Sequence, residues 1–99
     1  MNDPILSAIG LARRAGKLAP GFSAACGSLR RKHSFLIVVA SDISAKTEKE
    51  LRFFSGGTEV LRVPYTIFDI TCAIGTKAGV VSIDDEGLAK KILNLLHES

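Results

Sequence analysis

Apolar positions recur along the chain at helical spacing in some segments and as short unbroken runs in others, and the two kinds of segment alternate. Helical spacing bounded by capping or stop residues indicates five helices. These helices are expected from Pro4 to just before Gly16, over about Phe22–Lys32, over roughly Ala45–Phe54, from Thr66 to Gly75, and from Asp84-Asp85 toward the C-terminus. The unbroken runs predict strands at Ser34–Ala40, Glu59–Val63 and Gly79–Ile83, and a very short strand at Leu18-Ala19.

The run Ser34–Ala40 holds no charged residue and is rich in β-branched side chains, which is typical of a central strand buried on both faces. Strands that alternate with helices imply crossover connections. We therefore expect an α/β fold, a three-layer α/β/α sandwich with a mixed, mostly parallel four-stranded sheet. The chain has 99 residues, of which 46% are hydrophobic, so we expect one domain over residues 1–99.

Motifs for catalysis, cofactors or metals are not evident in the sequence. It contains no glycine-rich phosphate loop, and Cys26, Cys72, His33 and His97 are scattered without the paired spacing of metal ligands. We interpret both cysteines as packing residues. The expectation is a protein without a cofactor, a metal site or a catalytic residue, and so not an enzyme.

The longest uncharged apolar run, Phe35–Ala40, is far shorter than the ~20 residues that cross a bilayer. The N-terminal residues lack the features of a secretory signal. Two cysteines do not make a disulfide framework, which favours a reducing compartment. We expect a cytoplasmic monomer that does not contact membranes.

Charge is divided unevenly along the chain. Residues 1–34 hold six basic residues and one acidic residue, a net charge of +5, whereas residues 35–99 hold seven basic and nine acidic residues, a net charge of −2. A polyanionic partner near the first third is one interpretation of this asymmetry. The alternative is that Arg13, Arg14 and Arg31 are solvated charges that complement the dipoles of helix ends.

The aromatic content predicts how such a partner would be bound. The chain has five phenylalanines and one tyrosine, and Phe22, Phe35 and Phe54 are expected in the core. No aromatic platform for base stacking is therefore expected, and the predicted mode is recognition of shape and backbone.

Several segments together resemble one known family. They are Ile9–Leu18, Gly21, Leu36–Asp42, Val63–Tyr65, Ala73–Lys77, Val80–Asp84 and Gly87–Lys90. In this order they resemble the kink-turn RNA-binding ribosomal-protein superfamily, of the L-seven-Ae and L-thirty-e type, and most closely its small bacterial YlxQ-like members. The resemblance covers essentially the whole chain. It implies the α/β/α sandwich and a non-catalytic protein that binds structured RNA, such as ribosomal RNA or a kink-turn.

The resemblance also implies where RNA would bind. The family's Gly-x-Asn-Glu-x-x-Lys pattern at the start of the second helix corresponds here to Gly21, Ser23, Ala24 and Gly27, so that of the four only the glycine is kept. Further family contacts correspond to the loop Thr76–Gly79 and, at the short helix, to Asp69–Thr71. With the neighbouring basic residues, the candidate RNA-binding residues are Arg13, Arg14, Lys17, Gly21, Phe22, Ser23, Ala24, Gly27, Arg30, Arg31, Asp69, Lys77, Ala78 and Gly79.

Two alternatives stay open at this point. The chain could be a protein-interaction scaffold that kept the fold and lost specific RNA binding, since Ala24 and Gly27 have no polar side chain. It could also be the substrate-binding part of an RNA-modifying enzyme, which would require a second domain.

Overall fold

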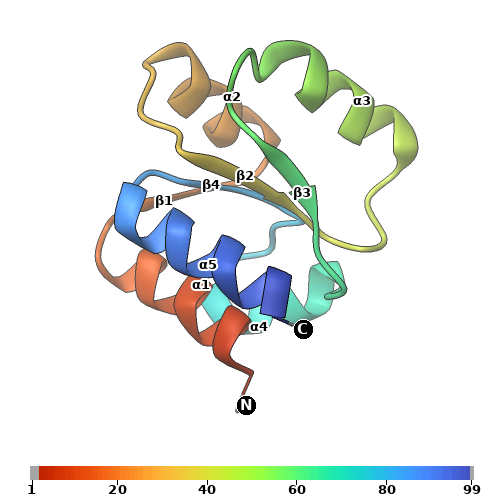
Figure 1. The fold of residues 1–99 in the computed structure, drawn as a ribbon. Helices are drawn as coiled ribbons and strands as arrows, with labels where there is room; N and C mark the ends of the chain where they lie inside the picture. Colours follow the sequence, from red (N-terminus) through yellow and green to blue (C-terminus); the bar gives the residue numbers. More distant parts are fainter. Residues whose placement is uncertain (1–2, 99) are drawn as a thin grey trace.

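The computed structural model describes residues 3–98 (Figure 1). Within these residues the chain forms five helices and four strands in alternating order. They are α1 (Pro4–Arg14), β1 (Leu18–Pro20), α2 (Phe22–Arg30), β2 (Leu36–Val39), α3 (Ala45–Phe54), β3 (Val60–Arg62), α4 (Ile67–Ile74), β4 (Val80–Ile83) and α5 (Glu86–Glu98). The predicted elements are all present, and the short strand at Leu18-Ala19 extends to Pro20.

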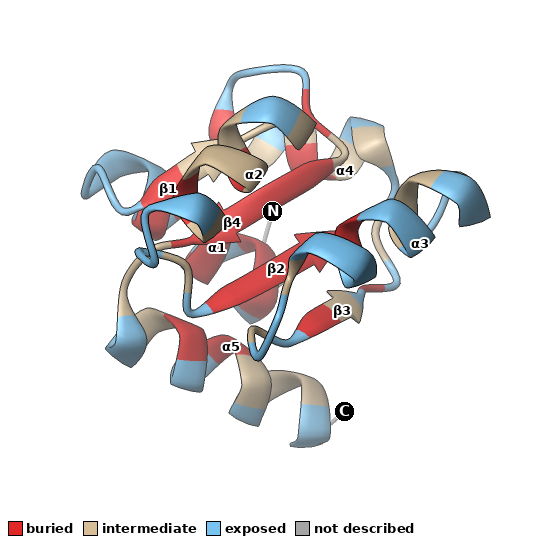
Figure 2. Cartoon of the chain, turned by 90° about the horizontal axis from the view of Figure 1, so that it is seen from above, coloured by how far each residue is buried: buried red, intermediate tan, exposed pale blue. Residues whose placement is uncertain are grey.

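The strands form a mixed sheet in the order β1-β4-β2-β3. Helices α2 and α3 cover one face, and α1, α4 and α5 cover the other (Figure 1). The predicted three-layer α/β/α sandwich is therefore confirmed. Seen from above, β2 and β4 are buried along their length, whereas the outer sides of α2 and α3 are exposed (Figure 2).

The prediction of a mostly parallel sheet is wrong. β2 pairs with β3 in parallel, but β4 is antiparallel to both of its neighbours, β1 and β2. The reason lies in the segment between β3 and β4. Its first residues are bonded near the end of β2 (Ser41 N to Tyr65 O, 2.7 Å), and so are its last (Ala40 N to Gly79 O, 2.8 Å). The chain thus leaves and returns at the same end of the sheet, and β4 has to run backwards.

The core lies on both sides of β2, whose four residues are fully buried. Leu36 and Val38 belong to the larger apolar cluster beneath α1, α4 and α5. Ile37 and Val39 belong to the smaller cluster beneath α2 and α3. This alternation is the two-residue period of a strand covered on both faces.

Three sequence predictions about packing are wrong. Phe35 is 48% exposed and Phe54 is 57% exposed, because Phe35 precedes β2 and Phe54 is the last residue of α3, both beyond the sheet that would cover them. Cys72 is exposed on α4, although Cys26 on α2 is half-buried as a packing residue would be. The helix α2 also ends two residues earlier than predicted, since Lys32 adopts a left-handed backbone conformation (φ 59°).

A polar cluster is buried between α2 and β4. Ser28 and Ser82 are fully buried, and their hydroxyls donate to the carboxylate of Asp84 at 2.8 and 2.6 Å. The hydroxyl oxygens of Ser82 and Ser34 are 2.7 Å apart. Among the described residues no buried side-chain nitrogen or oxygen lacks a hydrogen-bond partner. The cluster therefore fixes α2 on the sheet without the cost of an unsatisfied polar group.

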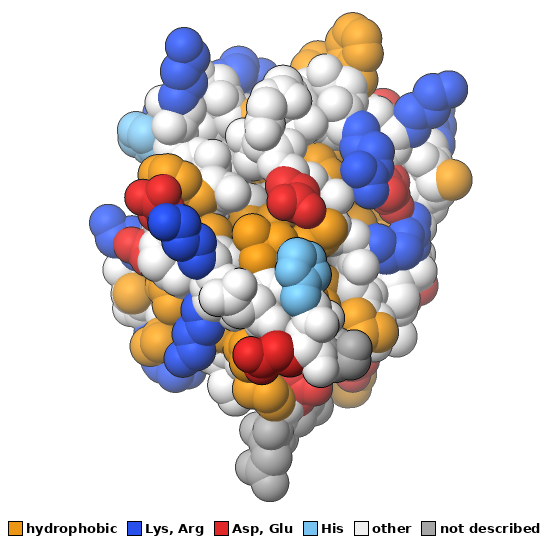
Figure 3. All heavy atoms as spheres, in the orientation of Figure 1, with side chains coloured by type: hydrophobic (Ala, Val, Ile, Leu, Met, Phe, Trp, Pro, Cys, Tyr) orange, Lys and Arg blue, Asp and Glu red, His pale blue; other side chains and the backbone are white. Residues whose placement is uncertain are grey.

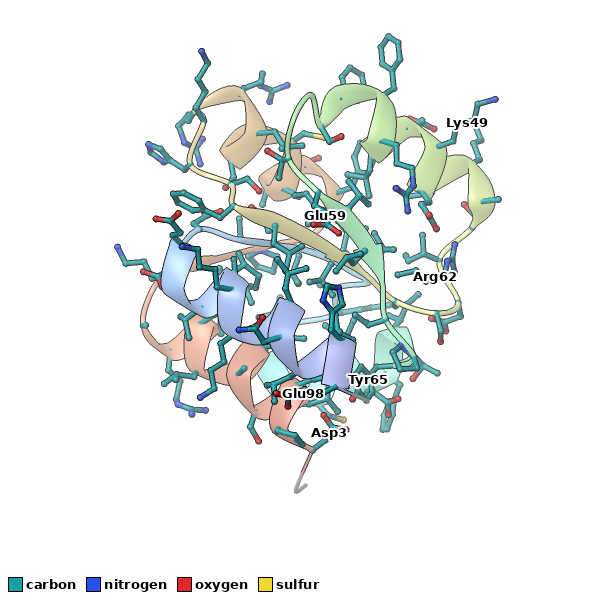
Figure 4. The ribbon with its side chains drawn as sticks, viewed as in Figure 1. Asp3, Lys49, Glu59, Arg62, Tyr65 and Glu98 are labelled. Atoms are coloured by element: carbon teal, nitrogen blue, oxygen red, sulfur yellow. The ribbon has the colours of Figure 1, made fainter. Side chains whose placement is uncertain are left out.

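A hydrogen bond joins the start of α1 to the segment that precedes α4. Asp3 caps α1 by accepting hydrogen bonds from Ile5 N and Leu6 N, and its other carboxylate oxygen accepts one from the Tyr65 hydroxyl at 2.6 Å (Figure 4). Burial acts to raise the pKa of Asp3, but these three hydrogen bonds outweigh it and lower that pKa. Burial, the hydrogen bond and the charge of Asp3 raise the pKa of Tyr65 to about 12.

The first prediction concerns the central strand. Val38→Ala should lower the free energy of unfolding by about 1–3 kcal/mol, through lost apolar burial and the cavity that remains. Chemical denaturation measures this difference. Leu11→Ala on the exposed side of α1 serves as the control and should change little, because Leu11 is 42% exposed. A loss below about half a kcal/mol for Val38→Ala would contradict the buried position of β2.

The second prediction concerns the Asp3–Tyr65 pair. Tyr65→Phe should lower the free energy of unfolding by about 1–2 kcal/mol at neutral pH. The pKa of Tyr65 is raised in the folded state, so its stabilising contribution is complete below the usual tyrosine pKa of 10.0 and is lost as the pH rises toward about 12. The pKa of Asp3 is lowered, so the contribution also falls as the pH drops below 3.8. Denaturation of both proteins across this range should show their difference shrinking at each extreme, and a constant difference would contradict the pairing.

Candidate nucleic-acid interface

The start of α2 is set by a glycine with a special backbone conformation. Gly21 has a φ of 94°, which L side chains rarely adopt, and it turns the chain from β1 directly into α2. Gly21 offers no side chain to cap the helix, so the N–H groups of the first turn have no side-chain acceptor. Ser23 is exposed, and Ala24 and Gly27 are half-buried, so little side-chain bulk stands over this end of α2.

The loop of residues 75–79 meets the start of α2. Gly21 N donates to Val80 O at 2.7 Å, which continues the β1–β4 pairing by one residue and sets Ala78 and Gly79 beside the start of the helix. The fit around Gly79 is close, because a Cβ there would lie 2.5 Å from Ile43 Cδ1 and 2.8 Å from Ile67 Cγ1. A side chain at residue 79 would therefore require the side chains of Ile43 and Ile67 to shift.

The other end of the same loop meets the end of α1. Arg13 Nη2 donates to Thr76 Oγ1 at 3.2 Å, next to Lys77. Arg14 lines a shallow hollow between α1 and α4 together with Cys72 and Ala73. The loop, which carries Lys77, thus connects two groups that are far apart in the sequence: the α1 arginines and the glycine-containing start of α2.

The remaining charged candidates lie away from the loop of residues 75–79, although Arg30 lines a groove together with Phe22 and Ser23. Arg30 and Arg31 stand at the far end of α2, a helix of nine residues, which is about 13 Å at 1.5 Å per residue. Lys17 lies at the end of the sheet where β4 finishes, in a hollow that also contains Lys32 and His33. The carboxylate of Asp69 accepts a hydrogen bond from Thr66 N at 3.0 Å and completes the capping box that the sequence predicted for α4. The fourteen candidates therefore do not form one continuous surface.

Two residues that the sequence reasoning did not include organise the loop beside this region. Arg62 donates to the carbonyl oxygens of Ser41 (2.6 Å) and Ile43 (3.1 Å), and also to Glu48 on α3 (2.8 Å) (Figure 4). Hydrogen bonds from Arg52 and from Arg62 lower the pKa of Glu48, against the opposing effect of burial. Asp42 accepts a hydrogen bond from Ile67 N at 2.9 Å and holds the start of α4. A single arginine on a short strand gives no sequence signal for such a role.

Among residues 3–98, no group of three or more His, Cys, Asp and Glu side chains is arranged to hold a metal ion. In the same part of the chain, no helix has the length and apolar character needed to cross a membrane.

No family model matches the chain. The RNA-binding protein YlxQ of Enterococcus faecium is 35% identical over 92 residues, which is 92% of this chain and 89% of that protein.

Solved structures share the fold. A protein of unknown function from Bacillus halodurans matches 95% of this chain and 97% of its own, with a TM-score of 0.87 and 27% identity. The 15.5kD RNA-binding protein of Giardia lamblia matches 99% of this chain and 89% of its own, with a TM-score of 0.76 and 14% identity. With a curated relative that is 35% identical and aligned over nearly the full length of both chains, the chain belongs to the YlxQ-type family.

Proposed function

We propose that residues 1–99 form one non-catalytic domain that binds structured RNA through the start of α2, the loop of residues 75–79 and the arginines at the end of α1. The observation that carries the proposal is the hydrogen bond from Gly21 N to Val80 O, which joins the two segments that the family resemblance assigns to RNA. The names of the relatives support the same function, since YlxQ and the 15.5kD protein are both called RNA-binding.

The physical basis is a backbone surface with positive charge at its margin. Unbonded N–H groups and the positive dipole end of α2 favour a phosphate group. The small residues Ser23 and Ala24 let an RNA backbone approach closely, and Arg13, Arg14 and Lys77 add charge along the loop. Such a surface recognises the shape and backbone of a folded RNA more than the edges of its bases.

The finer parts of the proposal follow from the family. A kink-turn or ribosomal RNA is the proposed partner, and we propose that the protein acts as a monomer in the cytoplasm as part of a ribonucleoprotein in translation. The second candidate is a scaffold for proteins that no longer binds RNA specifically. It is favoured by Ala24 and Gly27, which stand where the family has Glu and Lys and cannot make side-chain polar contacts.

The third prediction concerns charge. Arg13→Ala with Arg14→Ala should weaken RNA binding and lower the slope of log affinity against log salt by about 1.5, since each phosphate contact contributes roughly 0.7–0.9. Filter binding at several salt concentrations measures the slope.

Lys90→Ala is the control, because it removes a positive charge of α5 that is ion-paired with Glu86. Its slope should equal that of the unmodified protein. A second variant, Lys17→Ala with Arg31→Ala, tests the basic residues at the other end of the sheet. If the Arg13 and Arg14 variant leaves slope and affinity unchanged, these arginines are not part of the RNA surface.

The fourth prediction restores the family pattern. We expect the unmodified protein to bind a kink-turn RNA and a matched duplex with similar, modest affinity. Ser23→Asn, Ala24→Glu and Gly27→Lys together should strengthen kink-turn binding selectively, since a good polar contact contributes about 1–3 kcal/mol of discrimination. A lysine can be placed at position 27 once the flexible end of Arg31 shifts slightly, because the added Cβ would lie 3.2 Å from Arg31 Nη1. It should also stabilise α2 by about 1 kcal/mol.

Titration of both proteins against both RNAs is the measurement. Tight and selective kink-turn binding by the unmodified protein would show that Ala24 and Gly27 do not weaken recognition of the kink-turn. A triple variant that folds and gains nothing would remove α2 from the RNA surface and favour the scaffold.

A further inference from the structure

The end of α3 presents two aromatic rings to solvent. Phe53 is 82% exposed and Phe54 is 57% exposed, and their ring centroids are 5.3 Å apart in an edge-to-face arrangement. Hydrophobic side chains protrude at this place in the space-filling view, over α3, with Lys and Arg side chains on both sides (Figure 3). An exposed pair of large aromatic side chains is uncommon on a surface without a partner.

Phe54 borders a groove between α2 and α3, which lie next to each other on one face of the sheet (Figure 1). The groove has a volume of about 380 Å³ and is lined by Phe22, Ser23, Cys26, Leu29, Arg30 and Phe54. A neighbouring hollow of about 370 Å³ shares Phe54 and adds Phe53 with Lys46 and Lys49. We call the two together the aromatic groove.

The charges around the aromatic groove are mostly positive and unpaired. Arg30, Lys46 and Lys49 line it against one acidic residue, Glu50. Within the described part of the chain, none of these three cations forms an ion pair, whereas Arg52 on the same helix is paired with Glu48. Lys49 projects outward from α3 (Figure 4). Unpaired cations beside exposed rings suit a ligand that carries both negative charge and flat apolar faces.

The aromatic groove is also continuous with the surface already proposed for RNA. Phe22 and Ser23 form the first turn of α2 and line the groove as well. A strand that leaves a folded RNA at the start of α2 would enter the groove there and run between the helices toward Phe54. We propose that the aromatic groove binds one or two unpaired nucleotides next to the structured RNA, with their bases stacked on Phe53 and Phe54 and their phosphates near Arg30, Lys46 and Lys49.

This inference rests on the proposed function, and the groove adds a second mode of contact to it. Stacking on a phenylalanine tolerates any base, because every base has a flat π-face. An uncharged apolar peptide is less well matched, since it would leave Arg30, Lys46 and Lys49 without a counter-charge.

The test uses three forms of one kink-turn RNA: blunt-ended, with a single-stranded tail of about four nucleotides, and with the same tail made abasic. Tails are placed on the 5′ and on the 3′ side in separate RNAs. The unmodified protein should bind one tailed RNA at least about fivefold more tightly than the blunt RNA, which corresponds to one stacked base. The abasic tail keeps its phosphates and should give a smaller gain.

The decisive variant is Phe53→Ala with Phe54→Ala. It should lose the preference for the tailed RNA and keep the affinity for the blunt RNA within about twofold. Phe35→Ala is the matched control, an exposed phenylalanine that lines a different hollow, with Lys17 and Lys32, and it should keep the preference. Because Phe53 is so exposed, Phe53→Ala alone provides a variant whose folding is not in question.

Each other outcome has a defined meaning. Binding of the blunt RNA without preference for a tail overturns the inference, leaves the proposed function standing and makes a protein the better occupant of the groove. An equal gain from intact and abasic tails overturns stacking. Failure to bind any of the RNAs contradicts the proposed function itself.

Discussion

The hydrogen bonding of β4 between β1 and β2 is the constraint on which both the sheet and the candidate interface depend. β4 is antiparallel to each neighbour, so its first residues lie beside the last residues of β1 and of β2. Gly21 N bonds to Val80 O on one side of it, and Ala40 N bonds to Gly79 O on the other. These two bonds bring together segments that are about sixty and forty positions apart in the sequence. A parallel β4 would have placed the loop of residues 75–79 at the other end of the sheet, away from the start of α2.

Two polar clusters preserve this arrangement where apolar packing alone could not. Asp84 accepts hydrogen bonds from Ser28 on α2 and Ser82 on β4. These bonds fix both the orientation of α2 and its distance from the sheet. Arg62 holds the loop between β2 and α3 by donating hydrogen bonds to the carbonyl oxygens of Ser41 and Ile43. Hydrogen bonds have preferred angles and apolar contacts do not, so these clusters set the position of the helix start within the sandwich. Their residues lie outside the candidate site and still determine its shape.

The sequence predicted the elements well because their signals are local. The capping box at Thr66 and Asp69 and the apolar run of β2 depend on neighbours within a few positions, and both are confirmed. The direction of β4 depends on the path of residues 65–79, where α4 makes an excursion on one side of the sheet instead of a crossover. The eight residues of α4 have the same local pattern as a crossover helix, so the periodicity of apolar residues could not predict the direction of β4. The exposure of Phe54 was missed for the same reason, because an apolar residue at the end of a helix is buried only where another element reaches it.

The sequence predicted the part of the candidate site that depends on local backbone conformation. Gly21 is kept because the turn into α2 needs its positive φ, which is a requirement of the backbone whatever the ligand. The positions that in the family carry polar side chains are under no such constraint, and here they have become small. In the proposed function, a surface with an exposed helix start, few polar side chains and separate groups of cations would bind a phosphate backbone without reading bases. Discrimination among RNAs would then come from shape and from unpaired bases, which is the property that the exposed rings of α3, on the same face as α2, are suited to supply.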